Sequence, residues 1–334
     1  MTDGHSSGGD FAIQMHIAFS SQIDGVCGQD AQPYHCAATR FPNDNLVPQS
    51  NESSVPFCDG CPPGFTLVYD HCKGHPQWVD VGMLPDYPRR VCGDGGKIGC
   101  IDDVNFLQNT SVFLARSECR TYIGGSEVNA VALYAELTNE PNESILYFDD
   151  CNPDGSNKPN NTNAMCMQHV LPRITNRTLN PPVPKKDSNS SLGSWIRFNQ
   201  NEYIDDFNVG FDDAGWLFVP ETCKKGEKCT LMISFHGCGG CGDGGPPGVD
   251  GFDGYAASNG IVVLKPCIRY YNNASQTYPN SMEIERACWD GYGQLSSQYA
   301  LQSSPHMRNV WNMIKEVSRS THEAKTDCMG LCNQ

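Results

Sequence analysis

The sequence predicts an α/β fold with a largely parallel sheet. Short apolar runs of strand length recur along its 334 residues and alternate with segments of helical periodicity. Such alternation is typical of parallel sheets covered by helices. A chain of this length can also bury a large core. We therefore expect a single α/β domain over residues 1–334.

Each element follows from a local pattern. The segment DFAIQMHIAFSS at 10–21 alternates like a strand, whereas the two glycines before it and its small residues suit a helix leaving a tight turn. Strands are expected at 111–115, 144–148, 214–223, 229–238 and 259–267, and helices at 126–137 and 304–320. Residues 27–100, rich in Cys, Pro and Gly, predict stapled loops. Residues 152–193, rich in Asn, Pro and Ser, predict an exposed glycosylated loop.

Charge and hydropathy limit the partners. The net charge of −15 argues against nucleic acid and against an anionic membrane surface. No uninterrupted apolar run reaches the 18 residues of a spanning helix. We expect a monomer with no cofactor and no bound metal.

Eighteen cysteines are too many for a reducing compartment unless a metal binds them. The pairs Cys58-x-x-Cys61 and Cys238-x-x-Cys241 have zinc-like spacing, but neither has a second ligand pair at a suitable distance. The even cysteine count favours disulfides, and so do the N-glycosylation sequons, which point to a secreted, extracellular protein. These sequons begin at Asn51, Asn109, Asn142, Asn160, Asn176, Asn189 and Asn273.

Three disulfide features are expected from spacing. One bridge should lie within the 58–72 cluster, and one should join Cys223 to Cys229 across a Lys-rich turn. Cys328 and Cys332 should tie the C-terminal tail to the body or to each other. A secreted protein needs a signal peptide, and Met1 is followed by neither a basic nor an apolar leader segment. We therefore expect that the chain is truncated at its N-terminus.

The candidate chemistry begins with Gly4-His5-Ser6-Ser7-Gly8, a G-x-S-x-G pattern. In a nucleophile elbow the serine lies on a sharp strand-to-helix turn whose flanking glycines avoid clashes. The pattern alone also occurs in ordinary loops, but the run LMISFHGCGG at 231–240 adds a strand that ends in His-Gly. That arrangement predicts an oxyanion hole formed by the amides of Ser7 and Cys238.

Several segments in order resemble the extracellular polyhydroxybutyrate (PHB) depolymerases and related esterases. They are GHSSGGDFAIQMHIAFSSQIDGV (4–26), PYHCA (33–37), GWLFVPETC followed by CTLMISFHGC (215–238), and ACWDGYG followed by SPHMRNVWNMI (287–314). The resemblance implies a circularly permuted α/β-hydrolase fold, because the His-Gly strand follows the nucleophile by 230 residues. It also implies a triad with Ser6 as nucleophile and a carboxylic ester as substrate.

The family's other two triad residues have no counterpart. The stretch 113–123 places Arg120 where the family has its aspartate, and 147–159 places Ser156 where it has its histidine. Loss of a triad member typically leaves only about 10³–10⁴-fold catalysis over water. Glu118 is a candidate substitute for the acid and His169 for the base, although a histidine in a glycosylated loop has no necessary role.

Other candidate residues have simpler interpretations. His5 adjoins the serine, and we expect its side chain to point elsewhere; His236 should form structural hydrogen bonds, and His306 should lie on the surface. Trp289 and Tyr292 stand where the family has aromatic substrate-binding residues, but each also suits the core. Two functions follow: a secreted serine ester hydrolase acting on a polymer or small ester, or an inactive pseudoenzyme that serves as a binding glycoprotein.

Overall fold

The computed structural model describes most of the chain. The described residues are 1–38, 72–91, 100–117, 119, 125–138, 143–152, 154–156, 158, 161–183, 193–205, 209–225, 228–242, 252–270, 286–295 and 298–323. No helix within these ranges is long and apolar enough to cross a membrane.

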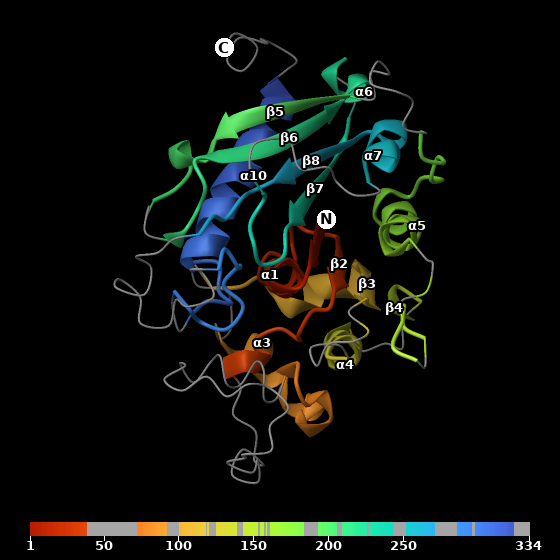
Figure 1. The fold of residues 1–334 in the computed structure, drawn as a ribbon, viewed down its shortest axis with the longest axis vertical. Coiled ribbons are helices and arrows are strands. Elements are labelled where there is room, and N and C mark those ends of the chain that lie inside the picture. Colours follow the sequence, from red (N-terminus) through yellow and green to blue (C-terminus); the bar gives the residue numbers. More distant parts are fainter. Residues whose placement is uncertain are drawn as a thin grey trace.

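An eight-stranded sheet forms the centre of the molecule (Figure 1), with strand order β4-β3-β2-β1-β7-β8-β6-β5. The strands are β1 (Thr2–His5), β2 (Gly25–Gln29), β3 (Ser111–Arg116), β4 (Ile145–Asp149), β5 (Gly193–Asn199), β6 (Ala214–Pro220), β7 (Thr230–Phe235) and β8 (Ile261–Lys265). Pairing is parallel from β4 through to β8, and antiparallel between β8 and β6 and between β6 and β5. The predicted α/β class with a mostly parallel sheet is therefore confirmed.

Helices connect the strands. The α-helices are α1 (Ser7–Ala18), α3 (Asp86–Arg90), α4 (Glu127–Thr138), α5 (Thr162–Thr175), α6 (Glu221–Lys224), α7 (Asp253–Asn259) and α10 (Pro305–Glu323). Short 3-10 helices are η1 (Cys36–Ala38), η3 (Pro76–Trp78), η4 (Val81–Met83), η5 (Val104–Asn109) and η6 (Gln200–Glu202). The ambiguous segment 10–21 is thus helical through Ala18, because it leaves the turn after β1.

The pleat of the strands divides the core between two faces. Val112 and Leu114 of β3 belong to one apolar cluster, whereas Phe113 and Ala115 belong to the other. The first cluster includes buried residues of α1, α4 and α10, and the second includes those of α5 and α7. Figure 1 shows α5 and α7 on the opposite side of the sheet from α10.

The expected exposed loop at 152–193 is wrong for its middle part. Residues 162–175 form α5, whose side chains Cys166, Met167, Val170 and Leu171 are buried. Asn161 caps this helix by accepting a hydrogen bond from the Ala164 amide at 3.0 Å. The apolar spacing has a helical period, but the surrounding Asn, Pro and Ser residues obscured it in the sequence.

Disulfides join segments that are distant in the chain. The pairs are Cys27–Cys166, Cys36–Cys72, Cys119–Cys151, Cys223–Cys229, Cys238–Cys288 and Cys241–Cys267. The predicted Cys223–Cys229 bridge is confirmed. Because Cys238 and Cys241 are oxidised, they carry no thiolate for zinc. Cys72 bonds outside its expected cluster, to Cys36, and Cys58, Cys61, Cys328 and Cys332 lie outside the described residues.

A carboxyl group is buried within the central strand. Asp3 accepts a hydrogen bond from the Ser234 hydroxyl at 3.1 Å, and its other oxygen has no hydrogen-bond partner among the described residues. Burial raises the pKa of Asp3 to about 7. The folded protein therefore holds a proton that the unfolded chain has already released between about pH 4 and pH 7.

This difference predicts a stability that falls as pH rises through that window. A pKa raised from 3.8 to about 7 corresponds to roughly 4 kcal/mol over the whole window, and Asp3→Asn should remove most of this pH dependence. Urea unfolding at pH 4.5 and pH 8 would measure the pH dependence of both proteins. Ser234→Ala, which keeps the carboxyl, is the control; equal pH dependence in wild type and Asp3→Asn would contradict the prediction.

Candidate active site

Ser6 lies on a strained turn between the central strand and the first helix. Its backbone angles are φ 56° and ψ −123°, a conformation that non-glycine residues seldom adopt. The Ser6 amide donates to the Gln29 carbonyl at 2.9 Å, and the Ser6 carbonyl accepts from the Asp10 amide at 2.9 Å. The side chain does not cap the helix and is partly exposed. This is the geometry of a nucleophile elbow.

The two glycines of the pattern allow this turn because three backbone segments meet there. A methyl group on Gly4 would lie 2.2 Å from the Gly8 carbonyl oxygen. One on Gly8 would lie 2.3 Å from the carbonyl oxygen of Phe235, at the end of β7. The elbow thus packs directly on the strand that carries the His-Gly sequence.

The turn after β7 lies beside the serine. A methyl group on Gly237 would be 3.6 Å from the Ser6 Cβ. The next residue, Cys238, is bonded to Cys288, and the Trp289 amide donates to the Ser7 hydroxyl at 3.4 Å. The segment at 288–289 therefore tethers both residues that were expected to supply oxyanion amides.

His236 has the structural role expected of it. Its Nε2 accepts a hydrogen bond from the Ile268 amide at 2.9 Å, so Nδ1 carries the proton and donates to the Gly237 carbonyl at 2.6 Å. Burial lowers the pKa of His236 to about 4, which keeps the ring neutral. The ring holds the turn between Phe235 and Cys238.

The aromatic candidates lie in the core. Trp289 is fully buried and stacks on Phe11 with ring centroids 4.8 Å apart, so its proposed contact with substrate is not supported. Tyr292 is also buried. The expectation that His306 lies on the surface is wrong: it is buried, accepts from the Asp290 amide at 3.1 Å and contacts the Val209 carbonyl at 2.7 Å. Trp289 and His306 thus pack against Phe11 of α1, the helix that follows the elbow.

The loops expected to hold the remaining triad residues are tied together. Cys119, after β3, is bonded to Cys151, after β4. The hydroxyl of Ser156 donates to Asp154 at 2.6 Å and accepts from Asn152 at 3.0 Å, within a local turn. Ser156 therefore does not take the role of the family's histidine as general base. Arg120 and Glu118 lie outside the described residues.

The structure does not place His169 near Ser6. Its Nε2 lies 3.0 Å from the carbonyl oxygen of Ser144, which precedes β4. That position is at the amino end of the parallel strands, whereas Ser6 follows the carboxyl end of β1. His169 also contacts Phe113 on the α5 side of the sheet. It does not fit the role of a substitute base.

A histidine and an aspartate do meet beside Ser6, but they are not the expected ones. His5 Nε2 lies 3.0 Å from Asp30 Oδ2; the His5 side chain is 43% exposed, and that of Asp30 is fully buried. Asp30 follows β2 directly, and register pairs His5 with Gln29. We expected the His5 side chain to point away from the serine and did not foresee its contact with Asp30, because nothing in the sequence links residues 5 and 30 except two adjacent strand ends.

A buried ion pair supports this corner of the site. Lys73 Nζ lies 3.0 Å from Asp10 Oδ2, in the first turn of α1, and donates to the Asp30 carbonyl at 3.0 Å. Asp10 also accepts from the Gln32 amide at 2.8 Å. Burial raises the pKa of Asp10, and the Lys73 ammonium opposes that shift. Lys73 thereby joins the helix after Ser6 to the turn that carries Asp30.

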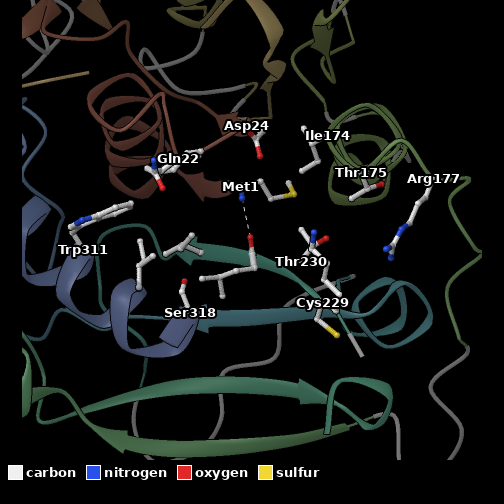
Figure 2. Close-up of a pocket in the computed structure, with 15 residues that line it drawn as sticks. Met1, Gln22, Asp24, Ile174, Thr175, Arg177, Cys229, Thr230, Trp311 and Ser318 are labelled. Atoms are coloured by element: carbon white, nitrogen blue, oxygen red, sulfur yellow. Dashed lines mark hydrogen bonds between the residues drawn. The ribbon is translucent and has the colours of Figure 1, made fainter. Parts of the chain in front are cut away.

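A cavity among the described residues lies elsewhere in the molecule. Figure 2 shows a pocket of about 380 Å³ around Met1, lined among others by Asp24, Arg177 and Trp311. Met1 precedes β1 and Asp24 precedes β2, so this pocket is at the amino ends of the strands. Ser6 lies at the opposite edge, and none of the candidate site residues lines the pocket. It is not the candidate active site.

A mostly parallel sheet with a serine on a strained strand-to-helix turn defines an α/β-hydrolase-like protein. Comparison with known proteins specifies this class further. The chain is homologous to a poly(3-hydroxybutyrate) depolymerase of Delftia acidovorans, with 26% identity over 95% of this chain and 59% of that protein. It thus spans about three fifths of the length of this relative. No family model matches the chain.

Solved structures show the same fold. One is a PHB depolymerase, with a serine changed to alanine, complexed with an R3HB trimer. Its TM-score is 0.66, with 20% identity over 94% of each chain. The PHB depolymerase from Penicillium funiculosum gives a TM-score of 0.60, also with 20% identity, over 94% of this chain and 93% of that one. The resemblance inferred from sequence motifs is therefore confirmed.

Proposed function

We propose that the protein is a serine ester hydrolase that acts on a polyhydroxyalkanoate or another carboxylic ester. The observation that carries this proposal is the strained turn at Ser6, held against the Gly237–Cys238 turn. Backbone strain of this kind costs roughly 1–3 kcal/mol and persists where the surrounding structure enforces it. A serine in an ordinary loop would have no need of it.

The chemistry follows from the placement of the backbone. The Ser6 hydroxyl attacks the ester carbonyl, and the amides of Ser7 and Cys238 stabilise the oxyanion that forms. Water then releases the acyl group from Ser6. The homologous and structurally similar PHB depolymerases support an ester substrate. We propose a monomer, because nothing in this chemistry requires a second copy.

The second candidate is a pseudoenzyme that serves as a binding glycoprotein. The observation that favours it is Ser156, a hydroxyl held in a turn at the position of the family's histidine. In that case the elbow would be retained as part of the fold, and the surface beside Ser6 would bind a ligand without turnover.

We propose that either form is secreted. The disulfides between distant segments support an oxidising compartment. Two sequon asparagines in the described ranges, Asn109 and Asn176, are exposed and thus accessible to glycosylation.

Labelling with a fluorophosphonate probe separates the two candidates, because the probe reacts with an activated serine whatever the substrate. We expect labelling of the folded, oxidised protein, and its reduction to background in Ser6→Ala. Ser258→Ala, on α7, is the control that should label normally. Hydrolysis of short 3-hydroxybutyrate oligomers would be measured in parallel. A folded wild-type protein that neither reacts with the probe nor cleaves the oligomers would leave the pseudoenzyme.

A further inference from the structure

The carboxyl ends of β1 and β2 bring an acid and an imidazole together beside Ser6. The two strands are neighbours and parallel, so His5 at the end of one faces the chain that leaves the other at Gln29. Asp30 follows there and its carboxylate contacts His5 Nε2 at 3.0 Å. A carboxylate at this distance selects the tautomer with the proton on Nε2, which leaves Nδ1 as the basic nitrogen.

Asp30 is held in place by several groups. The Ser117 amide donates to Asp30 Oδ1 at 2.8 Å, and the Ser117 hydroxyl donates to Oδ2. The Asp30 amide donates to the Ala115 carbonyl at 2.9 Å, and Lys73 donates to its carbonyl oxygen. Its backbone has φ 52°, in the left-handed region. A buried carboxylate fixed in this way is suited to orient an imidazole and to stabilise its charged form.

Ser117 connects this network to the loop after β3. Ser117 begins the loop after β3, where the resemblance places the catalytic acid. Here that loop donates hydrogen bonds to an acid at the end of the neighbouring strand. The carboxylate at this edge of the sheet therefore lies at the end of β2, one strand away from the end of β3.

The other ring nitrogen of His5 lies near the Gly237 turn, and so does the Ser6 side chain. A methyl group on Gly237 would lie 3.5 Å from His5 Nδ1 and 3.6 Å from the Ser6 Cβ. The two atoms therefore flank one small space at the turn that carries Cys238. With 43% of its side chain exposed, His5 is also accessible to water and to a substrate.

We propose that His5 is the general base for Ser6 and that Asp30 positions it, replacing the family's histidine and aspartate. This inference rests on the proposed ester hydrolysis. His5 Nδ1 takes the proton from the Ser6 hydroxyl, directly or through one water, as Oγ bonds to the ester carbonyl carbon. The carbonyl electron pair moves to oxygen and returns when the C–O bond to the leaving group breaks.

The protons balance over both half-reactions. The leaving alkoxide takes the proton from His5 Nδ1 and departs as an alcohol. A water molecule then gives a proton to the same nitrogen and attacks the acyl carbon. When that intermediate collapses, the proton returns to Ser6 and the carboxylic acid leaves. Asp30 keeps its charge throughout and stabilises the imidazolium.

The test compares the rates of fluorophosphonate labelling of Ser6 in wild type, His5→Gln and Asp30→Asn. General-base catalysis contributes about 10²–10⁴-fold, so His5→Gln should slow labelling by at least about 100-fold. Asp30→Asn keeps the size of the side chain and suits a left-handed backbone, and it should slow labelling less. His169→Gln, on α5, is the matched control and should label at the wild-type rate. Circular dichroism and thermal unfolding would show that each variant is folded.

The outcomes separate this proposal from the proposed function. Ser6-dependent labelling of wild type with an equal rate in His5→Gln would remove His5 as the base and leave the ester hydrolase standing. A folded wild type without labelling would overturn both. If His5→Gln does not fold, the wild-type pH profile and the Asp30→Asn variant test the proposal instead. The labelling rate of wild type should fall as pH falls through the titration of one histidine. A rate independent of pH between 5 and 8, together with normal labelling of Asp30→Asn, would overturn the role of the pair.

Discussion

Gly8→Ala should destabilise the protein by more than about 4 kcal/mol, or prevent it from folding. Local propensity predicts the opposite, because Gly8 is in the first turn of α1 and alanine stabilises a helix by about 1 kcal/mol over glycine. The new methyl group, however, would lie 2.3 Å from the Phe235 carbonyl oxygen and 2.4 Å from that of His236. Both are backbone atoms, so relief requires α1 to move away from β7. Overpacking of this kind exceeds the usual 1–3 kcal/mol because no side chain can yield.

Urea unfolding followed by circular dichroism would measure the effect. Gly82→Ala in η4 is the matched control, because its methyl group would meet only Asp80 Oδ1, at 3.4 Å. That variant should stay within about 1 kcal/mol of wild type. A Gly8→Ala protein as stable as Gly82→Ala would show that the elbow does not pack on β7 as described.

Lys73→Met should destabilise the protein by roughly 3–5 kcal/mol. The substitution retains an apolar side chain of similar length but leaves the Asp10 carboxyl buried without its counter-charge. It also removes the donor to the Asp30 carbonyl. An exposed ion pair provides the comparison: Arg90 and Asp86 lie 3.4 Å apart on α3 with side chains 78% and 55% exposed. Arg90→Met should cost at most about 1 kcal/mol.

The double variant Asp10→Asn/Lys73→Met tests the cause. It removes both charges of the buried Asp10–Lys73 pair, and the amide oxygen of the new asparagine side chain can still accept from the Gln32 amide. This variant should therefore be more stable than Lys73→Met alone. Equilibrium unfolding in urea at pH 7 would measure all four proteins. If Lys73→Met and Arg90→Met cost the same, the buried pair does not organise this corner of the site.

Patterns within short stretches of sequence were sufficient for the fold class and the elbow. Short apolar runs, which alternate with helical segments along the chain, placed β3, β4, β6, β7 and β8 close to their observed bounds. The Gly4–Gly8 pattern located the turn, and the short Lys-rich turn between Cys223 and Cys229 identified their bridge. Each of these features depends on neighbours within a few residues, so its physical cause is present in the sequence itself.

Only the tertiary structure decided what surrounds Ser6. Which strand ends become neighbours depends on the strand order of the sheet, and that order brings His5 beside Asp30 and separates His169 from Ser6. The partners of Cys238 and of Lys73 are likewise distant in sequence and are brought close only by the fold. A side chain's charge and burial depend on such contacts, because a carboxylate is stable in the interior only where donors from other segments converge on it. The sequence determined that a serine stands at the elbow, and the packing of β1, β2 and β3 determined which imidazole and carboxylate lie next to it.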